Sequence, residues 1–376
     1  FMISKNIFKK ILIITGLLAI FFILFIFSKS AQAPVINQNK TQLTTDNLQL
    51  TTRNLQTTTL FFAGDIMLSL NIADKIYKAG SFTLPFKNVS EEISKADIAF
   101  ANLESPFLNS GKHNNQGLVF NANPQFVLGL QTAGFDILST ANNHALDQGT
   151  KGLDFTLEHL KNSGIIATGT TNSKSETTLP TIEKNGLVFG FLSYSYAGIN
   201  DGGKTTSKYV NNFNDLEKLK QDIIAMKGHT ADIIIVAMHA GTEYTRTPTE
   251  AQINFAHAAI DAGADLVIGS HPHWIQTIEK YNDKWIFYSL GNFVFDQMWS
   301  TATREGLTVF VTYENEHIPD PLNKTAGEDR GLIKKIELKL VIIEDYCCPR
   351  WANKEEGLKI LGKIGLTSPV LLDKNE

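Results

Sequence analysis

The feature that most constrains the fold of this chain is a series of short apolar runs, each followed by polar or glycine-bearing residues. Within residues 59–273 the runs read TLFFAGD, ADIAFANLE, FDILSTANNH, DIIIVAMHAG and DLVIGSHPH. Their apolar residues are mostly β-branched or aromatic, which is typical of strands buried on both faces of a sheet. The sequence therefore predicts a core of buried strands that end in polar side chains.

Amphipathic stretches separate these predicted strands. The spacing predicts helices over Thr150–Gly164 and over Pro248–Ala264. The second stretch has a proline at its start, Glu250 in its first turn and Gly263 at its end, which are helix start and stop signals. Strand, turn, helix and strand in succession indicate an α/β fold with functional residues at the carboxyl ends of the strands.

The pattern changes in the second half of the chain. Long apolar segments there predict strands joined by hairpins, with a turn at Tyr281–Lys284. These segments are residues 274–295, 307–319 and 331–343. We expect the folded domain to span residues 60–345, followed by a C-terminal tail, residues 346–376, with a helix around Lys354–Lys363.

The first 29 residues predict a membrane anchor or a secretory signal. Three lysines precede the uncharged run Ile11–Phe27, whose length lies between a signal core of about 7–15 residues and a membrane span of about 17 or more. We favour an uncleaved single-pass anchor; the alternative is cleavage after Ala33 and secretion. Lysines before the run leave the main domain extracytoplasmic in either case. Residues 30–59, rich in Gln, Asn and Thr, are expected to be a flexible linker.

Charge and cysteine content exclude several classes of protein. The formal net charge is -4, and no dense Lys/Arg face follows the first ten residues, so a nucleic-acid partner is not expected. The two cysteines are the neighbours Cys347 and Cys348, which rules out a disulfide framework and a thiolate zinc site. Neighbouring cysteines rarely bridge each other without strain, so we expect no disulfide between them.

Each of the five predicted strands is followed by a side chain that can bind a metal or move a proton. These side chains are Asp65, Glu104, Asn142, Asn143, His144, His239, His271 and His273. A single histidine after a strand is more often structural, and a single aspartate is more often a helix cap. Side chains two apart in an extended segment point the same way, so His271 and His273 form a stronger signal. If the strand ends converge, this oxygen and nitrogen set suits Zn, Mn or Fe.

Other polar residues fall into two groups. The remaining histidines are expected to be structural or solvated: His159 and His257 on predicted helices, and His113, His229 and His317 in predicted loops. Near the strand-end set, four residues are candidates for substrate contact, with a plain surface loop or turn as the alternative. They are Glu243, Tyr244, Arg246 and Asn292.

Six motifs occur in the order and spacing of a known family: FAGDIML, ANLESP, ANNHALDQG, MHAGTEY, AGADLVIGSHPH and YSLGNFVFD. Over about Leu60–Glu314 the chain resembles the bacterial capsule synthesis CapA family, which is linked to poly-γ-glutamate capsules and belongs to the calcineurin-like metallophosphoesterase superfamily. The resemblance implies a four-layer α/β/β/α sandwich, with two sheets face to face, helices outside and a metal site at one sheet edge.

The resemblance also implies roles for the residues of the set. Asp65 and His273 would bind one metal, and Glu104 would take the place of the bridging carboxylate. The second metal would be bound by Asn143, His239 and His271. His144 would protonate the leaving group or stabilise the transition state. Such a site holds one or two divalent transition metals (Mn, Fe or Zn), and it activates a water for attack on a phosphoester or an amide.

Two positions depart from the superfamily pattern. Met67 stands where an Asp-x-His motif would supply an imidazole, and Glu104 stands where an aspartate is commoner. A single metal, or a vestigial site without turnover, therefore remains open at this point. So does the question whether the protein is an enzyme.

The resemblance implies a membrane-tethered extracytoplasmic protein of capsule synthesis or export with a hydrolase-like metal site. The alternative is a non-catalytic scaffold of a polymer-export complex that uses a structural metal site. The implied partners are the cytoplasmic membrane, capsule synthesis or export membrane proteins, and an anionic polymer. A secreted nucleotidase ranks last, because the sequence shows no aromatic base-stacking motif.

Overall fold

The computed structural model describes residues 56–109, 118–172, 179–204, 206–228, 231–315 and 331–374. The predicted membrane segment, the linker up to residue 55 and three histidines (His113, His229 and His317) lie outside these ranges. Within the described ranges no helix is both long and apolar enough to cross a membrane.

The first sheet runs in the order β14-β13-β12-β1-β2-β3-β4, with β11 also paired to β1 and β15 to β13. Its β1 to β4 half is parallel, and its β12 to β14 half is antiparallel. Its strands are β1 (Thr57–Ile66), β2 (Ile98–Leu103), β3 (Ile137–Ser139), β4 (Ile166–Thr168), β11 (Asn292–Val294), β12 (Glu305–Asn315), β13 (Gly331–Glu344), β14 (Cys348–Trp351) and β15 (Val370–Asp373).

The second sheet runs in the order β5-β6-β7-β8-β10-β9. Its centre, β6-β7-β8-β10, is parallel, and antiparallel hairpins form both edges. The β9–β10 hairpin turns at Asn282 and Asp283, so the predicted turn is confirmed. The strands are β5 (Thr181–Lys184), β6 (Leu187–Ser195), β7 (Ile233–His239), β8 (Leu266–Ser270), β9 (Ile278–Tyr281) and β10 (Lys284–Phe287).

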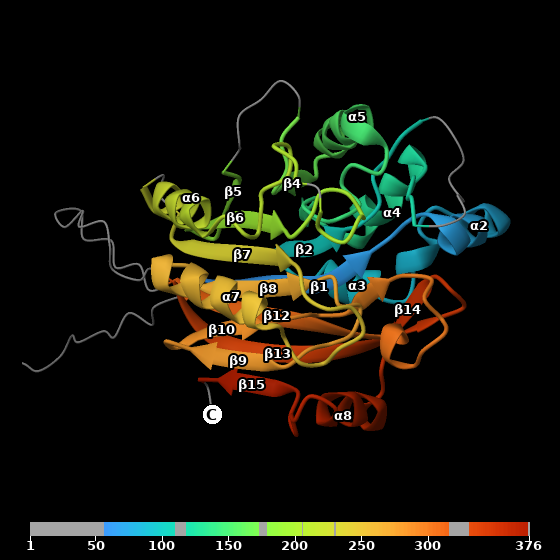
Figure 1. The fold of residues 1–376 in the computed structure, drawn as a ribbon. Coiled ribbons are helices and arrows are strands. Elements are labelled where there is room, and N and C mark those ends of the chain that lie inside the picture. The colour runs from blue at the N-terminus through green and yellow to red at the C-terminus, as the bar shows by residue number, and fades with distance from the viewer. Residues whose placement is uncertain are drawn as a thin grey trace, which may run out of the picture. The chain divides into compact units, whose positions relative to one another are not determined.

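Helices cover the outer face of each sheet (Figure 1). Those that pack on the first sheet are α2 (Leu70–Ala79), η1 (Leu84–Phe86), α3 (Ser90–Ile93), η2 (Pro124–Phe126), α4 (Val127–Ala133) and α5 (Gly149–Asn162). Those that pack on the second sheet are α6 (Leu216–Gly228) and α7 (Glu250–Ala262). Both helices predicted from the spacing, α5 and α7, are therefore confirmed within two residues at each end.

Three large apolar cores among the described residues hold these layers together. One lies between the sheets and contains Phe62, Phe100 and Phe191, whose rings meet at centroid distances of 5.9 and 6.0 Å. The other two lie between each sheet and its own helices. Two sheets face to face with helices outside make the α/β/β/α sandwich that was expected.

The sheet continues past residue 345, where we expected the domain to end. β14 and β15 both pair with β13, and α8 (Lys354–Gly362) adds Ile360 and Leu361 to the core between the sheets. The expectation of unbridged cysteines is wrong, because Cys347 and Cys348 form a disulfide at the β13–β14 turn. Asp345 and Tyr346 in that turn both have positive φ angles. This backbone geometry could not be predicted from the fact that the two cysteines are adjacent in the sequence.

Candidate metal centre

The site lies where the carboxyl ends of strands from both sheets meet. Asp65 is the next-to-last residue of β1, Glu104 directly follows β2, and His239 ends β7. The position of Asp65 is fixed by a close approach between the backbones of Gly64 and Gly291. A Cβ on Gly64 would lie 1.8 Å from the carbonyl oxygen of Gly291, so only glycine lets the strands pair here. The neighbouring Asp65 amide donates to that same oxygen at 3.0 Å.

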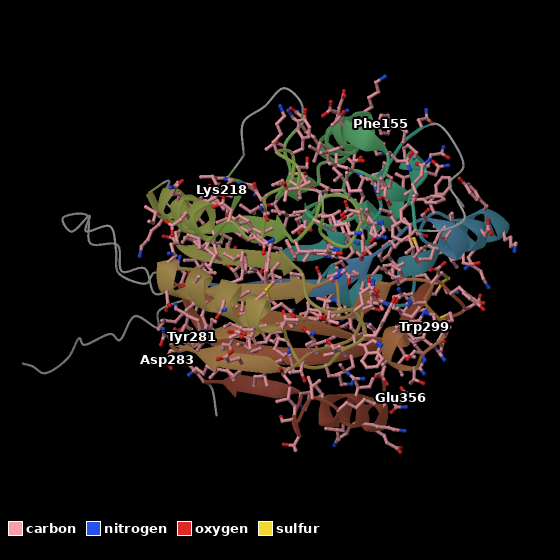
Figure 2. All side chains as sticks on the ribbon, in the orientation of Figure 1. Phe155, Lys218, Tyr281, Asp283, Trp299 and Glu356 are labelled. Atoms are coloured by element: carbon pink, nitrogen blue, oxygen red, sulfur yellow. A yellow bond between two sulfur atoms is a disulfide. The ribbon has the colours of Figure 1, made fainter. Side chains whose placement is uncertain are left out.

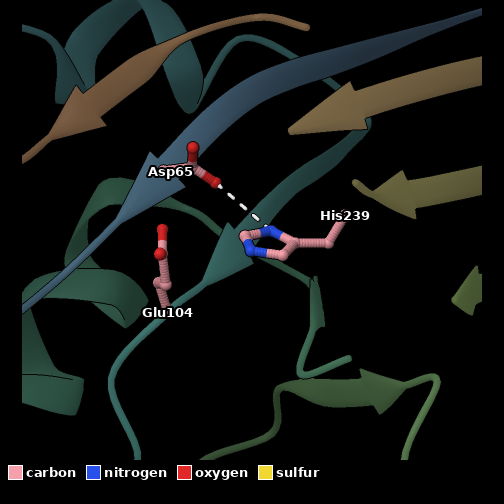
Figure 3. Close-up of side chains that lie close together, drawn as sticks. All are labelled: Asp65, Glu104 and His239. Carbon is pink, nitrogen blue, oxygen red and sulfur yellow. Dashed lines mark ion pairs between the residues drawn. The ribbon is translucent and has the colours of Figure 1, made fainter. Parts of the chain in front are cut away.

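Three of the predicted ligands gather at one point. Asp65, Glu104 and His239 are buried, and each offers an atom within 4.8 Å of the other two (Figure 3). His239 Nδ1 lies 3.8 Å from Asp65 Oδ1. The three side chains come from β1, the end of β2 and β7. His239 therefore joins a group whose other two members lie more than a hundred positions before it in the sequence.

His239 joins this group to Asn143. Its Nε2 lies 2.8 Å from Asn143 Oδ1, and its Nδ1 lies 3.0 Å from Ser270 Oγ. Two atoms bound to one cation at about 2.1 Å and at right angles stand about 3 Å apart. The separation of His239 Nε2 and Asn143 Oδ1 therefore fits two ligands of a shared ion.

His271 and His273 follow β8 on a turn with unusual backbone. Their φ angles are 96° and 56°, a region that residues other than glycine adopt at a cost and mostly at functional sites. The His271 amide donates to Asp65 Oδ2 at 3.2 Å, and His273 Nδ1 lies 3.6 Å from that same oxygen. Asn292 Oδ1 lies 2.9 Å from His273 Nδ1, so it orients this imidazole rather than facing solvent.

Burial sets the protonation of these groups. It raises the pKa of Asp65 to about 7 and lowers that of His273 to about 4. Burial, followed by the neighbouring Asp65 carboxylate, raises the pKa of Glu104 well above its ordinary value. Burial lowers the pKa values of His239 and His271 well below normal, which keeps both imidazoles neutral, the form that binds a cation.

The residues present fit a divalent cation. Both carboxylate oxygens of Glu104 and the Nδ1 of His271 are buried without a hydrogen-bond partner among the described residues. Buried polar atoms are nearly always paired, and a bound ion is one of the few explanations for an exception. A cation would bond to these atoms and offset the cost of burying two carboxylates side by side.

His144 stands at the edge of this group with its orientation fixed. Its Nδ1 lies 2.7 Å from Asp147 Oδ2, and the Phe120 ring stacks on the imidazole at a centroid distance of 4.0 Å. Because a carboxylate accepts hydrogen bonds, this contact assigns the Nδ1 proton to the His144–Asp147 pair. The other ring nitrogen, Nε2, then lies on the side of the carboxylate group, 3.8 Å from Glu104 Oε1.

Met67 does not take part in the site. It is fully buried in the core under the first sheet, and its sulfur accepts a hydrogen bond from the Ser69 amide at 3.0 Å. The position that would carry an imidazole in the superfamily pattern is therefore used for packing.

The loop candidates for substrate contact take different positions. Glu243 is exposed and Tyr244 is partly buried beside His273, at a ring-centroid distance of 6.0 Å. Arg246 lies over the Trp274 ring, donates to the Ile275 carbonyl oxygen at 3.1 Å and pairs with a buried glutamate. The histidines on helices, His159 and His257, bond to Pro124 and Glu279 outside the site, as expected.

Several residues of the site were missed by the sequence analysis. Asn102 donates to Asp65 Oδ1 at 2.7 Å and lies 3.2 Å from His239 Nδ1, so it separates two predicted ligands. Side chains two positions apart in a strand point to the same face, and Asn102 stands two positions before Glu104 in the same motif, so this spacing could have identified it. Asp147 and Ser270 had no such signal, since Asp147 lies on a turn whose path the sequence does not reveal and Ser270 meets His239 through the β7–β8 register.

The chain is similar to proteins of bacterial capsule synthesis. The profile of the family described as "Bacterial capsule synthesis protein PGA_cap" matches residues 59–297. The chain is 30% identical over 318 residues to the capsule biosynthesis protein CapA of Bacillus anthracis, covering 80% of this chain and 77% of that protein. It is also 30% identical over 296 residues to the PGA biosynthesis protein CapA of Bacillus subtilis (strain 168), covering 73% and 76%. The solved structure of Haemophilus influenzae NAD nucleotidase is similar over 85% of this chain and 57% of that one, at 12% identity and a TM-score of 0.47.

Proposed function

The chain belongs to the bacterial capsule synthesis protein PGA_cap family, and from this membership we propose that it acts in making, exporting or trimming an anionic surface polymer such as poly-γ-glutamate. The proposed location is the outer side of the cytoplasmic membrane, with residues 1–29 as the tether, because lysines precede the apolar run Ile11–Phe27. The proposed partners are the polymer and other membrane proteins of capsule synthesis or export.

The proposed chemistry is metal-dependent hydrolysis of a phosphoester or an amide. The observation that carries it is Glu104, a buried carboxylate without a hydrogen-bond partner beside Asp65 and His239. The proposed ligands of one or two Mn, Fe or Zn ions are Asp65, Glu104, Asn143, His239, His271 and His273. A bound ion would lower the pKa of a water and polarise the substrate.

The proposed proton donor is His144. Asp147 holds its Nδ1, and Phe120 packs on one face of the ring, so Nε2 points toward the carboxylate group with little freedom to rotate. In the imidazolium form, which also carries a proton on Nε2, such a positioned ring would give that proton to the leaving oxygen or nitrogen as its bond breaks. A scaffold would have no use for such an arrangement, which favours an enzyme.

We predict that His144→Ala lowers kcat by about 100- to 10,000-fold while metal content stays at the wild-type value. The assay measures hydrolysis of p-nitrophenyl phosphate and chain shortening of poly-γ-glutamate by metal-loaded protein. His257→Ala is the matched control, because this histidine lies on α7 outside the site and pairs with Glu279. Equal activities of His144→Ala and wild type would contradict the proposed role.

A second candidate function is a scaffold with a structural metal. The observation that favours it is Met67, which replaces a potential ligand and is buried in the core. Stoichiometric metal in the wild-type protein, without turnover of either substrate, would support this second function and reject the enzyme.

A further inference from the structure

Two aromatic side chains stand beside the metal centre and are not used by the chemistry described above. They are Tyr244, on the loop after β7, and Trp299, on the segment between β11 and η3 (Ala302–Arg304). The Trp299 side chain is 63% exposed, and its ring meets the Tyr244 ring edge-on at a centroid distance of 4.8 Å. Figure 2 labels Trp299 on the side of the molecule toward which β1 and β7 point. We call Tyr244 and Trp299 the aromatic wall.

The aromatic wall is linked to a predicted metal ligand. Tyr244 stacks beside His273 with an interplanar angle of 26°. Its hydroxyl accepts from Gln297 at 3.3 Å, Gln297 Oε1 accepts from Asn292 at 3.1 Å, and Asn292 holds His273 Nδ1. This chain of hydrogen bonds fixes Tyr244 relative to His273, and Trp299 packs on Tyr244.

The backbone of Tyr244 is also held in an unusual conformation. Its φ is 62°, which costs free energy for any residue with a side chain, and its amide donates to the Pro272 carbonyl oxygen at 2.8 Å. The loop thus bonds to the same turn that carries His271 and His273. An exposed tryptophan that packs on a strained tyrosine, itself fixed against this turn, indicates a surface shaped for a ligand.

The charge around the wall bears on which ligand it takes. Glu243 is exposed and is the neighbour of Tyr244 in the chain. Arg246, on the same loop, already pairs with Glu305 and lies over Trp274. The wall therefore offers flat apolar faces, a phenol hydroxyl and an acceptor carboxylate, which suit a ring with hydroxyl donors better than a row of carboxylates.

We propose that the aromatic wall binds a sugar ring attached to the group that is hydrolysed at the metal centre. The C–H groups on one face of a pyranose would pack on Trp299, and its hydroxyls would donate to Glu243 and Tyr244. This inference rests on the proposed hydrolytic function of the same site, and it names the substrate class: a phosphoester whose leaving group is a sugar.

The test compares three phosphoesters on metal-loaded protein: glucose 1-phosphate, adenosine monophosphate and glycerol phosphate. We expect Trp299→Ala to raise KM for glucose 1-phosphate about tenfold, with little change in kcat and none in KM for glycerol phosphate. Trp299→Phe keeps a flat ring and should restore most of the affinity. Trp351→Ala, which removes a half-buried tryptophan from β14, is the matched control.

Equal rises in KM for all three esters, or a rise for adenosine monophosphate alone, would overturn the sugar assignment. Calorimetric binding of glucose 1-phosphate to wild type and Trp299→Ala provides a reading that needs no turnover. If the protein shows no turnover but binds glucose 1-phosphate in a way that depends on Trp299, the proposed hydrolysis is rejected and sugar binding by the aromatic wall is supported. If the protein turns over glucose 1-phosphate with the same KM in wild type and Trp299→Ala, the proposed hydrolysis is supported and sugar binding by the aromatic wall is rejected.

Discussion

At the scale of single residues, Glu104 and Asp65 set the electrostatics of the site. Two fully buried carboxylates lie close together, and no described lysine or arginine pairs with either of them. Burial raises both pKa values, so without a cation these groups favour their protonated forms at mildly acidic pH. A cation binds the deprotonated forms and therefore has to displace protons.

This competition predicts a pH-dependent metal affinity. Asp65 has a pKa of about 7 without metal, so the apparent affinity should weaken as pH falls below 7, by about tenfold per pH unit for each displaced proton. Calorimetry at pH 6 in two buffers of different ionisation enthalpy should detect about one or more protons released per cation. An affinity that is constant between about pH 5.5 and 8 would contradict the pKa assignment.

The same shift has a consequence for stability. The folded-state pKa of Asp65, about 7, is raised above the ordinary 3.8, so the folded protein holds this proton more tightly than the unfolded chain does. The contribution of Asp65 to metal-free stability is therefore fully present below about pH 4 and is lost as pH rises to 7. A bound cation removes this loss, because it takes the place of the proton.

At the scale of elements, α7 begins at the end of the loop that leads away from His239 and the metal centre. Its N-terminus is capped by Thr249, which accepts from the Gln252 amide, while Gln252 Oε1 accepts from the Thr249 amide. Gln252 is itself buried and donates to Gln276. The capping box therefore joins the helix start to the segment after His273.

Loss of this cap should be measurable. We predict that Thr249→Ala lowers the free energy of unfolding by about 1 kcal/mol, because the hydrogen bond to the Gln252 amide disappears. Urea unfolding followed by circular dichroism measures it, and Thr249→Ser, which retains the hydroxyl, should stay close to wild type. A stability of Thr249→Ala equal to that of wild type would show that the cap is not needed.

The elements also show what the sequence could predict. Buried strands such as β7 and β8, and helices α5 and α7, were predictable because apolar runs and capping signals are local. The role of β14, α8 and β15 was not, because their apolar residues are few and their partners lie on β13 and in the core between the sheets. Trp299 was missed since its contacts depend on loop geometry, whereas Asn102 lies on β2, where its spacing from Glu104 was a usable signal.

At the scale of the whole molecule, the two sheets create the site. Neither sheet alone carries it, because Asp65 and Glu104 come from the first sheet and His239 and His271 from the second. The core between the sheets, with Phe62, Phe100 and Phe191, fixes the separation of these two groups. The positions of the ligands were predictable from strand order, whereas their distances depend on this packing.

The most direct test of the account is the amount of transition metal bound per chain. The protein, purified without chelator, would be compared with His271→Ala and with the control His257→Ala by elemental analysis. We predict one or two Mn, Fe or Zn ions per wild-type and control chain, and a clear loss in His271→Ala. A wild-type protein that binds no transition metal, even after incubation with an excess of each ion, would contradict the central claim.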